Sequence, residues 1–149
     1  MEYAAKDVFS IYASASWYCG GPYPTNDANM SLTFDLKTGK KTEFENLFKN
    51  YDEDKDQILR TIFAVQLEKA DSLAASGKQS DNTCEGEPDI FSIERLRDSS
   101  YSYTFSKAGL VVQPSWRHVI EACAERVTVP YHKLQGFAAP DGILARVMP

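Results

Sequence analysis

The sequence predicts an α+β fold in which an antiparallel sheet packs against one principal helix, accompanied by short helices. Three observations support this class. Residues alternate between apolar and polar near both ends of the chain, one long apolar stripe at helical spacing occupies the middle, and turns containing Gly or Pro separate these segments. The chain has 149 residues, of which 43% are hydrophobic. This size suits one cored domain, which we expect to span residues 1–149.

A long hairpin is predicted at the start of the chain. Residues 9–19 alternate with a period of two, which is typical of a half-buried strand. Its apolar positions are Phe9, Ile11, Ala13, Ala15, Trp17 and Cys19. Residues 19–29 contain Gly, Pro, Asn and Asp without periodicity, and we interpret them as a structured loop. The alternation returns over residues 30–37 and predicts the second strand of the hairpin.

Helical spacing follows the hairpin. Thr42 and Glu45 have the spacing of a capping box, and Phe44, Leu47 and Phe48 indicate a short helix with one apolar face. Apolar residues then recur at helical spacing, which predicts the principal helix over residues 54–75. An acidic stretch lies near the start of this helix, where negative charge interacts favourably with the helix dipole.

The second half of the chain is predicted to be mainly strands. Alternating or apolar runs predict strands over residues 90–96, 101–106, 110–113 and 126–129. Residues 114–124 are interpreted as a turn or a short helix, and a terminal turn is expected to begin over residues 131–134. Strands on both sides of a central helix are typical of an α+β domain.

The charge balance argues against several classes of protein. There are 16 Lys and Arg residues against 21 Asp and Glu residues, which gives a formal charge of −5. A nucleic-acid binder that relies on overall positive charge is not expected, whereas a cationic protein partner would be attracted. No apolar run approaches the roughly 20 residues of a membrane-spanning helix. The first residues do not resemble a secretory signal, and we expect the natural protein to have sequence upstream of Met1.

The residues that commonly carry chemistry do not form a recognisable catalytic or metal-binding motif. Asp52, Asp54 and Asp56 have the opening spacing of a calcium loop, but Gln57 and Phe63 occupy its required Gly and Glu positions. We therefore predict no metal site, and no phosphate-binding glycine loop points to a cofactor. Neither a G-x-S-x-G elbow nor a reactive-cysteine context accompanies a histidine, so we predict a protein that is not an enzyme.

The cysteines leave two alternatives open. Cys19, Cys84 and Cys123 are far apart and lack the C-x-x-C spacing of a zinc site. One disulfide with one free thiol is expected in an oxidising compartment, and three reduced cysteines acting as small hydrophobes in a reducing one.

Aromatic residues in loops are the candidate binding residues. Tyr18 and Tyr23 flank Gly20 and Gly21 on a constrained, nonhelical connection, and Trp116 forms a second candidate patch. Rigid aromatic side chains on loops supply contact area at a low cost in conformational entropy. The competing interpretation is that these aromatic residues pack over the end of the hairpin.

Several motifs, taken in order, resemble the RsiV-like domain of unknown function. The first is Cys19-Gly20-Gly21-Pro22-Tyr23-Pro24. It is followed by the motifs at residues 32–40, 45–48, 103–112 and 129–134, so that the resemblance extends from residue 8 to residue 134. The family includes the extracellular part of the lysozyme-binding anti-sigma factor RsiV and an accessory region of PdaC-like peptidoglycan deacetylases.

The resemblance implies an exported, non-enzymatic bacterial domain that is periplasmic, anchored in the cell envelope or secreted. It implies a binding module for an envelope protein or a glycan, with lysozyme, another basic envelope protein or peptidoglycan as candidate partners. The chain departs from the family where Tyr23 replaces a loop histidine. The alternative hypothesis is a cell-wall polymer hydrolase or deacetylase, or its accessory domain, with His118 or His132 as the base.

Overall fold

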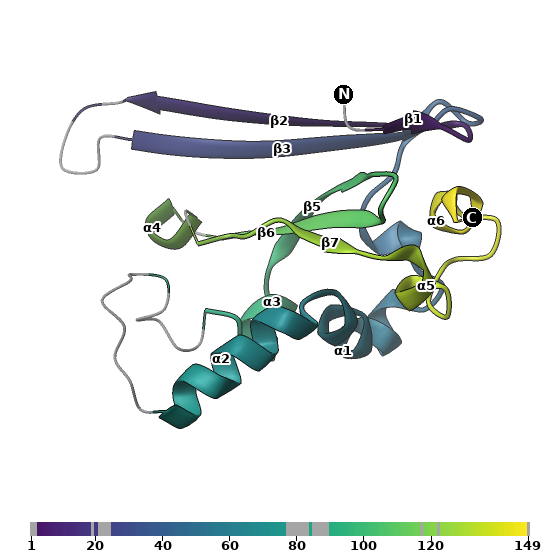
Figure 1. Cartoon of the computed structure of the whole chain (residues 1–149). Coiled ribbons are helices and arrows are strands. Elements are labelled where there is room, and N and C mark those ends of the chain that lie inside the picture. Colours follow the sequence, from purple (N-terminus) through teal and green to yellow (C-terminus); the bar gives the residue numbers. More distant parts are fainter. Residues whose placement is uncertain are drawn as a thin grey trace.

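Two antiparallel sheets and a set of helices form an α+β fold, as predicted. The computed structural model describes residues 3–18, 20, 25–76, 84, 90–116, 118–121 and 123–148. Figure 1 shows successive layers: a long hairpin, a second sheet beneath it, and helices α1 to α3 on the far side of that sheet. The apolar core lies mainly between the second sheet and these helices.

The first sheet is built on a long hairpin. Its strand order is β1-β2-β3-β4, with β1 (Tyr3–Ala5), β2 (Val8–Tyr18), β3 (Thr25–Asp35) and β4 (Lys40–Lys41). Strand β2 pairs with β3 from Val8↔Asp35 to Tyr18↔Thr25. Residues 25–29 therefore belong to β3, and the loop predicted over residues 19–29 is too long, because pairing with β2 outweighs the low strand propensity of Asn and Asp.

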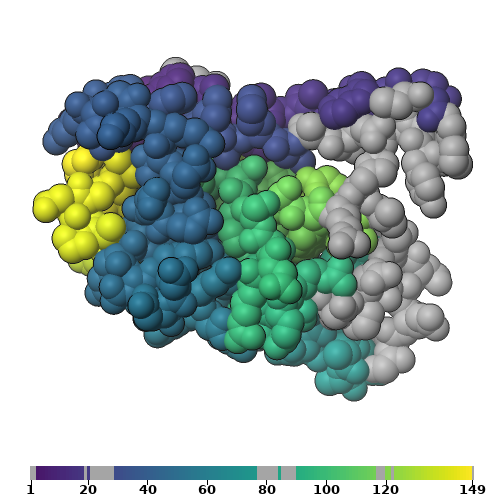
Figure 2. Space-filling model, turned by 180° about the vertical axis from the view of Figure 1, so that it is seen from behind, coloured from purple at the N-terminus to yellow at the C-terminus, as the bar shows by residue number. Residues whose placement is uncertain are grey.

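Most of the hairpin extends beyond the short strands beside it. Strand β1 pairs only with residues 8–10 of β2, and β4 pairs only with Phe34 and Asp35 of β3. Figures 1 and 2 show the remaining length of β2 and β3 projecting along one side of the molecule.

The hairpin turns its polar face inward. The even-numbered residues Val8 and Ser10 of β2 are fully buried, whereas the strand is exposed from Ala13 onward. The alternation predicts a half-buried strand correctly, but its apolar residues at odd positions lie on the outer face. Because residues that face each other across antiparallel strands share a face, Leu32, Phe34 and Met30 of β3 lie on this outer face too.

Two serine hydroxyls hold the polar face of the hairpin against the second sheet. The amide N–H of Tyr103 donates to Oγ of Ser31 at 2.7 Å, and that of Phe105 donates to Oγ of Ser10 at 3.4 Å. Ser10 Oγ also lies 2.7 Å from the hydroxyl of the buried Thr33. These hydroxyls satisfy N–H groups at the edge of the second sheet that would otherwise be costly to bury.

The second sheet confirms three of the strands predicted in the second half of the chain. Its order is β5-β6-β7, with β5 (Ser100–Phe105), β6 (Leu110–Ser115) and β7 (Val127–Val129). Strand β6 is central and buried on both faces over residues 110–114. Gly109 is required before it, because a Cβ there would lie 2.0 Å from the carbonyl oxygen of Val129.

The principal helix is interrupted. Instead of one helix over residues 54–75, α1 (Tyr51–Ile62) and α2 (Ala64–Ser76) are separated at Phe63. The side chain of Phe63 is fully buried, with its ring centroid 5.9 Å from that of Tyr101 and 6.3 Å from that of Phe91. We attribute the break to this packing, since the local sequence contains no Pro or Gly.

The short helices include two corrections. The short helix predicted near residue 44 is η1 (Glu45–Leu47), but it begins at Phe44 without a side-chain cap, so the capping box at Thr42 is wrong. The strand predicted over residues 90–96 is also wrong, because α3 (Ile93–Arg97) lies there. The Oγ of Ser92 accepts a hydrogen bond from Arg95 N–H and caps that helix, a signal that outweighs the apolar run. The remaining helices are α4 (His118–Glu121), α5 (Tyr131–Leu134) and α6 (Ile143–Val147).

Two buried tyrosines donate hydrogen bonds to backbone carbonyls in the core. The hydroxyl of Tyr103 donates to the carbonyl of Thr42 at 2.6 Å, and that of Tyr131 donates to the carbonyl of Ser106 at 2.6 Å. Burial raises the pKa of Tyr131 to about 12 and raises that of Tyr103 further. Both phenols therefore remain protonated donors at neutral pH.

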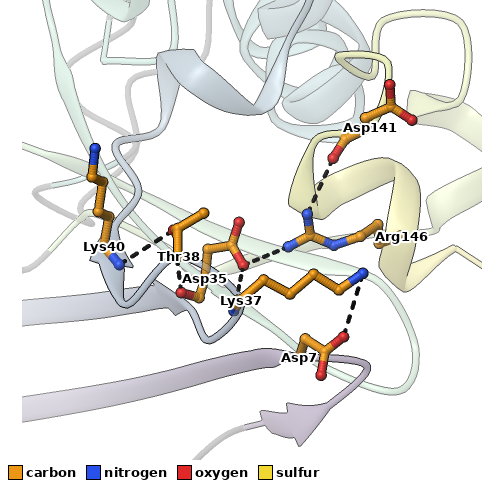
Figure 3. A network of polar contacts seen from close by, with 7 residues as sticks. All are labelled: Asp7, Asp35, Lys37, Thr38, Lys40, Asp141 and Arg146. Carbon is orange, nitrogen blue, oxygen red and sulfur yellow. Dashed lines mark hydrogen bonds and ion pairs between the residues drawn. The ribbon is translucent and has the colours of Figure 1, made fainter.

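A shielded ion pair joins the C-terminal helix α6 to the end of β3. Arg146 Nη2 lies 2.8 Å from Asp35 Oδ1, and the two side chains are only 22% and 14% exposed. Arg146 Nη1 also donates to the carbonyl of Asp141 at 3.1 Å (Figure 3). The guanidinium beside it holds the pKa of Asp35 below its usual value.

Replacing Asp35 with Asn is expected to destabilise the protein at pH 7 by about 1 kcal/mol, because Arg146 loses its shielded counter-charge. A carboxyl whose pKa is lower in the folded state stabilises the fold above its unfolded pKa, near 4, and this contribution is lost as the pH falls through the folded pKa. Urea unfolding of both proteins between pH 7 and pH 2.5 measures this difference.

The matched control is Asp7→Asn. The Oδ2 atom of Asp7 lies 3.5 Å from the Nζ atom of Lys37, and 55% of the Asp7 side chain is exposed. This variant is therefore expected to change the free energy of unfolding by less than about 0.5 kcal/mol. Equal effects of the two substitutions, or an Asp35→Asn effect that does not shrink in acid, would contradict this account of the ion pair.

Replacing Ser31 with Ala is expected to cost about 1–2 kcal/mol and lower Tm by about 2–8 °C, because the amide of Tyr103 loses its acceptor. Ser31→Thr keeps the hydroxyl and should retain most of the stability, and Ser14→Ala, at an exposed position of β2, should be neutral. Thermal melts compare the three variants. A Ser31→Ala protein as stable as the parent would show that the hydroxyl does not hold the sheets together.

Candidate functional site

The distal part of the hairpin displays large apolar side chains. Trp17 is 46% exposed, Tyr18 is 73% exposed and Met30 is 51% exposed. We call Trp17, Tyr18 and Met30 the hairpin surface. Trp17 and Met30 lie on the outer face of the sheet, and Tyr18 ends β2 on the opposite face. Aromatic and Met side chains are enriched in protein-binding surfaces, and these three are exposed on the two faces of the same part of the hairpin.

A polar cluster lies behind the middle of the hairpin. The hydroxyl of Tyr12 lies 2.7 Å from Asn29 Oδ1 and 3.2 Å from Gln113 Oε1, and it donates its single proton to one of them. The guanidinium carbon of Arg126 lies 3.9 Å from the centre of the Tyr12 ring. Gln113 in turn donates to the carbonyl of Ala124 at 2.8 Å. The middle of the hairpin is thereby fixed to β6 and to the segment before β7.

Helix α4 contacts the same inward side of the hairpin (Figure 1). The carboxylate of Glu121 accepts a hydrogen bond from the amide of Trp116 at 2.9 Å and one from Asn29 Nδ2 at 3.5 Å. Just beyond α4, Cys123 forms a disulfide with Cys84. Of the two alternatives left open for the cysteines, the disulfide is therefore present, while Cys19 lies outside the described residues.

The predicted binding residues are distributed over two places. Tyr18 is exposed at the end of β2, and Gly20, two residues later, has φ +79° and open space where a Cβ would lie. Gly21 and Tyr23 lie outside the described residues. Trp116 directly follows β6 of the other sheet: its ring packs edge-on against Phe91 with centroids 5.0 Å apart, and its Nε1 donates to Ser99 Oγ at 3.2 Å.

The two histidines of the sequence analysis lie on two short helices, and its three aspartates all lie on α1. His132 is an exposed residue of α5, and His118 is the first residue of α4. Asp56 on α1 forms an ion pair with Arg97 on α3, which lowers the pKa of Asp56. Within the part of the chain that the structure describes, no three His, Cys, Asp or Glu side chains are grouped as metal ligands would be.

Sequence reasoning missed Trp17 and Met30 as surface residues, because an apolar face is ordinarily assigned to the core. A signal was present in the chain. The even positions of β2 from Ser10 to Ser16 are occupied only by Ser and Tyr, which carry hydroxyls and no charge. Such side chains can be buried when they find hydrogen-bond partners, whereas a charged face cannot be buried without counter-charges.

Comparison with known proteins shows similarity of fold. No protein-family model matches the sequence, and no curated protein matches it significantly. No helix among the described residues is long and apolar enough to cross a membrane. The structure is similar to that of a DUF3298 family protein from Pseudomonas aeruginosa PAO1, with a TM-score of 0.56 and 10% sequence identity. The match covers 96% of this chain and 58% of that chain, so this chain spans less than two thirds of the length of that protein. At this identity, the similarity is one of fold.

Proposed function

We propose that this chain is a non-enzymatic binding module of an exported bacterial protein, of the RsiV-like kind, which recognises a basic protein partner through the hairpin surface. The observation that supports this proposal most strongly is the exposure of Trp17, Tyr18 and Met30. They lie on a hairpin whose middle is held by polar contacts to the rest of the protein. Lysozyme, a small basic protein, is the partner that we propose to test first.

The contacts that hold the hairpin in place favour binding, because they reduce the conformational entropy that the hairpin loses on association. The contacts of Tyr12 with Asn29, Gln113 and Arg126 hold the middle of the hairpin, and the serine hydroxyls hold its base. A surface that is already ordered loses less conformational freedom when it binds a partner.

The charge of the chain supports a basic partner. The formal charge of −5 attracts a cationic protein over distances comparable to the Debye length, about 8 Å at physiological ionic strength. Such attraction chiefly raises the association rate, while the apolar side chains of the hairpin surface would supply affinity.

The disulfide between Cys84 and Cys123 supports the proposed location. Structural disulfides form and persist in oxidising compartments such as the bacterial periplasm and the extracellular space. We therefore propose that the domain is periplasmic, anchored in the cell envelope, or secreted.

The double variant Trp17→Ser/Tyr18→Ala is expected to weaken binding to lysozyme by at least about tenfold, because the partner would lose an aromatic contact on each face of the hairpin end. Biolayer interferometry with immobilised domain measures the affinity at low and high salt, and soluble peptidoglycan fragments are tested beside lysozyme. Val65→Ser is the matched control, since Val65 is 70% exposed on α2, away from the hairpin. It should bind like the parent protein.

Two results would contradict the proposal. One is the absence of binding to both ligands, and the other is an affinity that does not change when Tyr18 and Trp17 are replaced. Catalytic turnover of peptidoglycan that is lost in His132→Ala would instead favour the cell-wall enzyme considered in the sequence analysis.

A further inference from the structure

One short segment between β6 and β7 supplies several of the contacts that hold the middle of the hairpin. We call residues 118–121 and 123–126 the linking segment. Its helix α4 lies beside β3, beneath the projecting part of the hairpin in Figure 1. Three of its groups contact the hairpin or the side chain behind it: the carboxylate of Glu121, the carbonyl of Ala124 and the guanidinium of Arg126. The position of the hairpin therefore depends on the position of this segment.

These groups act on two hairpin residues, Tyr12 and Asn29. The carbonyl of Ala124 accepts the hydrogen bond from Gln113 Nε2 at 2.8 Å, which leaves Gln113 Oε1 3.2 Å from the hydroxyl of Tyr12. On β3, Asn29 Nδ2 lies 3.5 Å from Glu121 Oε1, and Asn29 Oδ1 lies 2.7 Å from the same Tyr12 hydroxyl. The linking segment thus reaches both strands of the hairpin through one connected network.

The linking segment has little regular structure of its own. Helix α4 has four residues, and helices of this length are not stable in water without further contacts. The amide of Cys123 donates at 3.0 Å to the carbonyl of Ile120, but this bond lies within the segment. The disulfide from Cys123 to Cys84 ties the segment covalently to a part of the chain that precedes α3.

The two sulfur atoms of this disulfide differ in accessibility. Cys123 is buried in the core, whereas Cys84 is only partly buried. A thiolate of a dithiol reductant is therefore expected to attack Sγ of Cys84. The S–S bond breaks, its electron pair leaves on Sγ of Cys123, and that sulfur takes up a proton. The second thiol of the reductant then resolves the mixed disulfide, so that the reductant is oxidised to a disulfide and Cys84 is released as a thiol.

We propose that the Cys84–Cys123 disulfide is a redox-sensitive device that controls the order of the hairpin surface. While the bond is intact, the linking segment holds Tyr12 and Asn29 in place. Once the bond is reduced, the linking segment separates from β3, and the part of the hairpin beyond these two residues loses its attachment to the rest of the protein.

The effect reaches the proposed recognition surface. Trp17 and Tyr18 lie beyond Tyr12 on β2, and Met30 directly follows Asn29 on β3. A hairpin that is detached at these points has to be ordered again when it binds, which weakens its affinity for a partner. This consequence for binding rests on the proposed function, whereas the loss of order in the hairpin does not.

The base of the hairpin is expected to stay in place after reduction. It is held by two serine hydroxyls at the edge of the second sheet and by the ion pair of Asp35 with Arg146. None of these groups belongs to the linking segment. Reduction should therefore loosen one end of the hairpin instead of destabilising all parts of the fold equally, as the general effect of a disulfide on the unfolded chain would.

Amide hydrogen exchange measured by NMR tests the loss of order. The parent protein for this experiment carries Cys19→Ser, which leaves Cys84 and Cys123 as its only cysteines. Reduction with dithiothreitol is expected to speed exchange of the amides that pair β2 with β3 over residues 13–18 by at least about tenfold, because a hairpin without support is marginally stable. The amides of Tyr103 and Phe105, at the base, should change by less than about twofold. Unchanged exchange over residues 13–18, or equal acceleration in all strands, would overturn the proposal.

Glu121→Ala tests the route through the linking segment. With the disulfide intact, this variant is expected to speed exchange of the same hairpin amides. Reduction should then add less than it adds in the parent, because both changes release the same contact. Glu125→Ala is the matched control, since Glu125 is exposed and contacts Gln66 on α2 instead of the hairpin. The control should respond fully to reduction, and additive effects of Glu121→Ala and reduction would overturn the proposed coupling.

Binding to lysozyme tests the regulation of the hairpin surface separately. The variant Cys84→Ser/Cys123→Ser replaces the reduced protein here, because a dithiol also acts on disulfides of a partner. It is expected to bind at least about threefold more weakly than the parent, and circular dichroism checks that it is folded. Equal affinities would overturn control of the surface by the disulfide. If the parent itself does not bind lysozyme, the proposed partner is wrong, and the hydrogen-exchange results alone decide this inference.

Discussion

The structure depends on the way in which serine hydroxyls of the hairpin meet the open edge of the second sheet. Ser31 and Ser10 accept hydrogen bonds from the amides of Tyr103 and Phe105, at the side of β5 that does not pair with β6. Without these acceptors, β5 would bury unsatisfied N–H groups, at a cost of about 1–3 kcal/mol each. The contact therefore determines which face of the hairpin lies against the rest of the protein.

The orientation of the hairpin has a consequence for its outer face. Because the polar residues of β2 and β3 are used inward, the apolar residues on the other face remain on the outside, with Trp17 and Met30 among the most exposed. This links a packing requirement at the base of the hairpin to the proposed recognition surface near its end. The shielded pair of Asp35 and Arg146 adds a second connection, between the end of β3 and the C-terminal helix.

Much of the fold could be predicted from local patterns, and the errors have identifiable physical causes. The hairpin and strand β5 follow from alternation, because each has one face that differs in polarity from the other, whereas β6 follows from a short apolar run and is buried on both faces. The break at Phe63 could not be predicted, since it follows from packing against Phe91 and Tyr101, which are distant in sequence. Among the candidate binding residues, Tyr18 is exposed as a binding residue needs to be, whereas Trp116 packs against Phe91. Alternation reveals two different faces but does not say which one lies inside, and the exposure of Met30 was missed for this reason.

Amide hydrogen exchange measured by NMR tests the central claim most directly. If Ser31 and Ser10 accept the edge hydrogen bonds of β5, the amides of Tyr103 and Phe105 should be protected to a similar degree as that of Thr104, which points toward β6. Exchange of the Tyr103 and Phe105 amides at the rate of an unstructured peptide, with Thr104 still protected, would contradict the account. The hairpin would then not be held by its polar face.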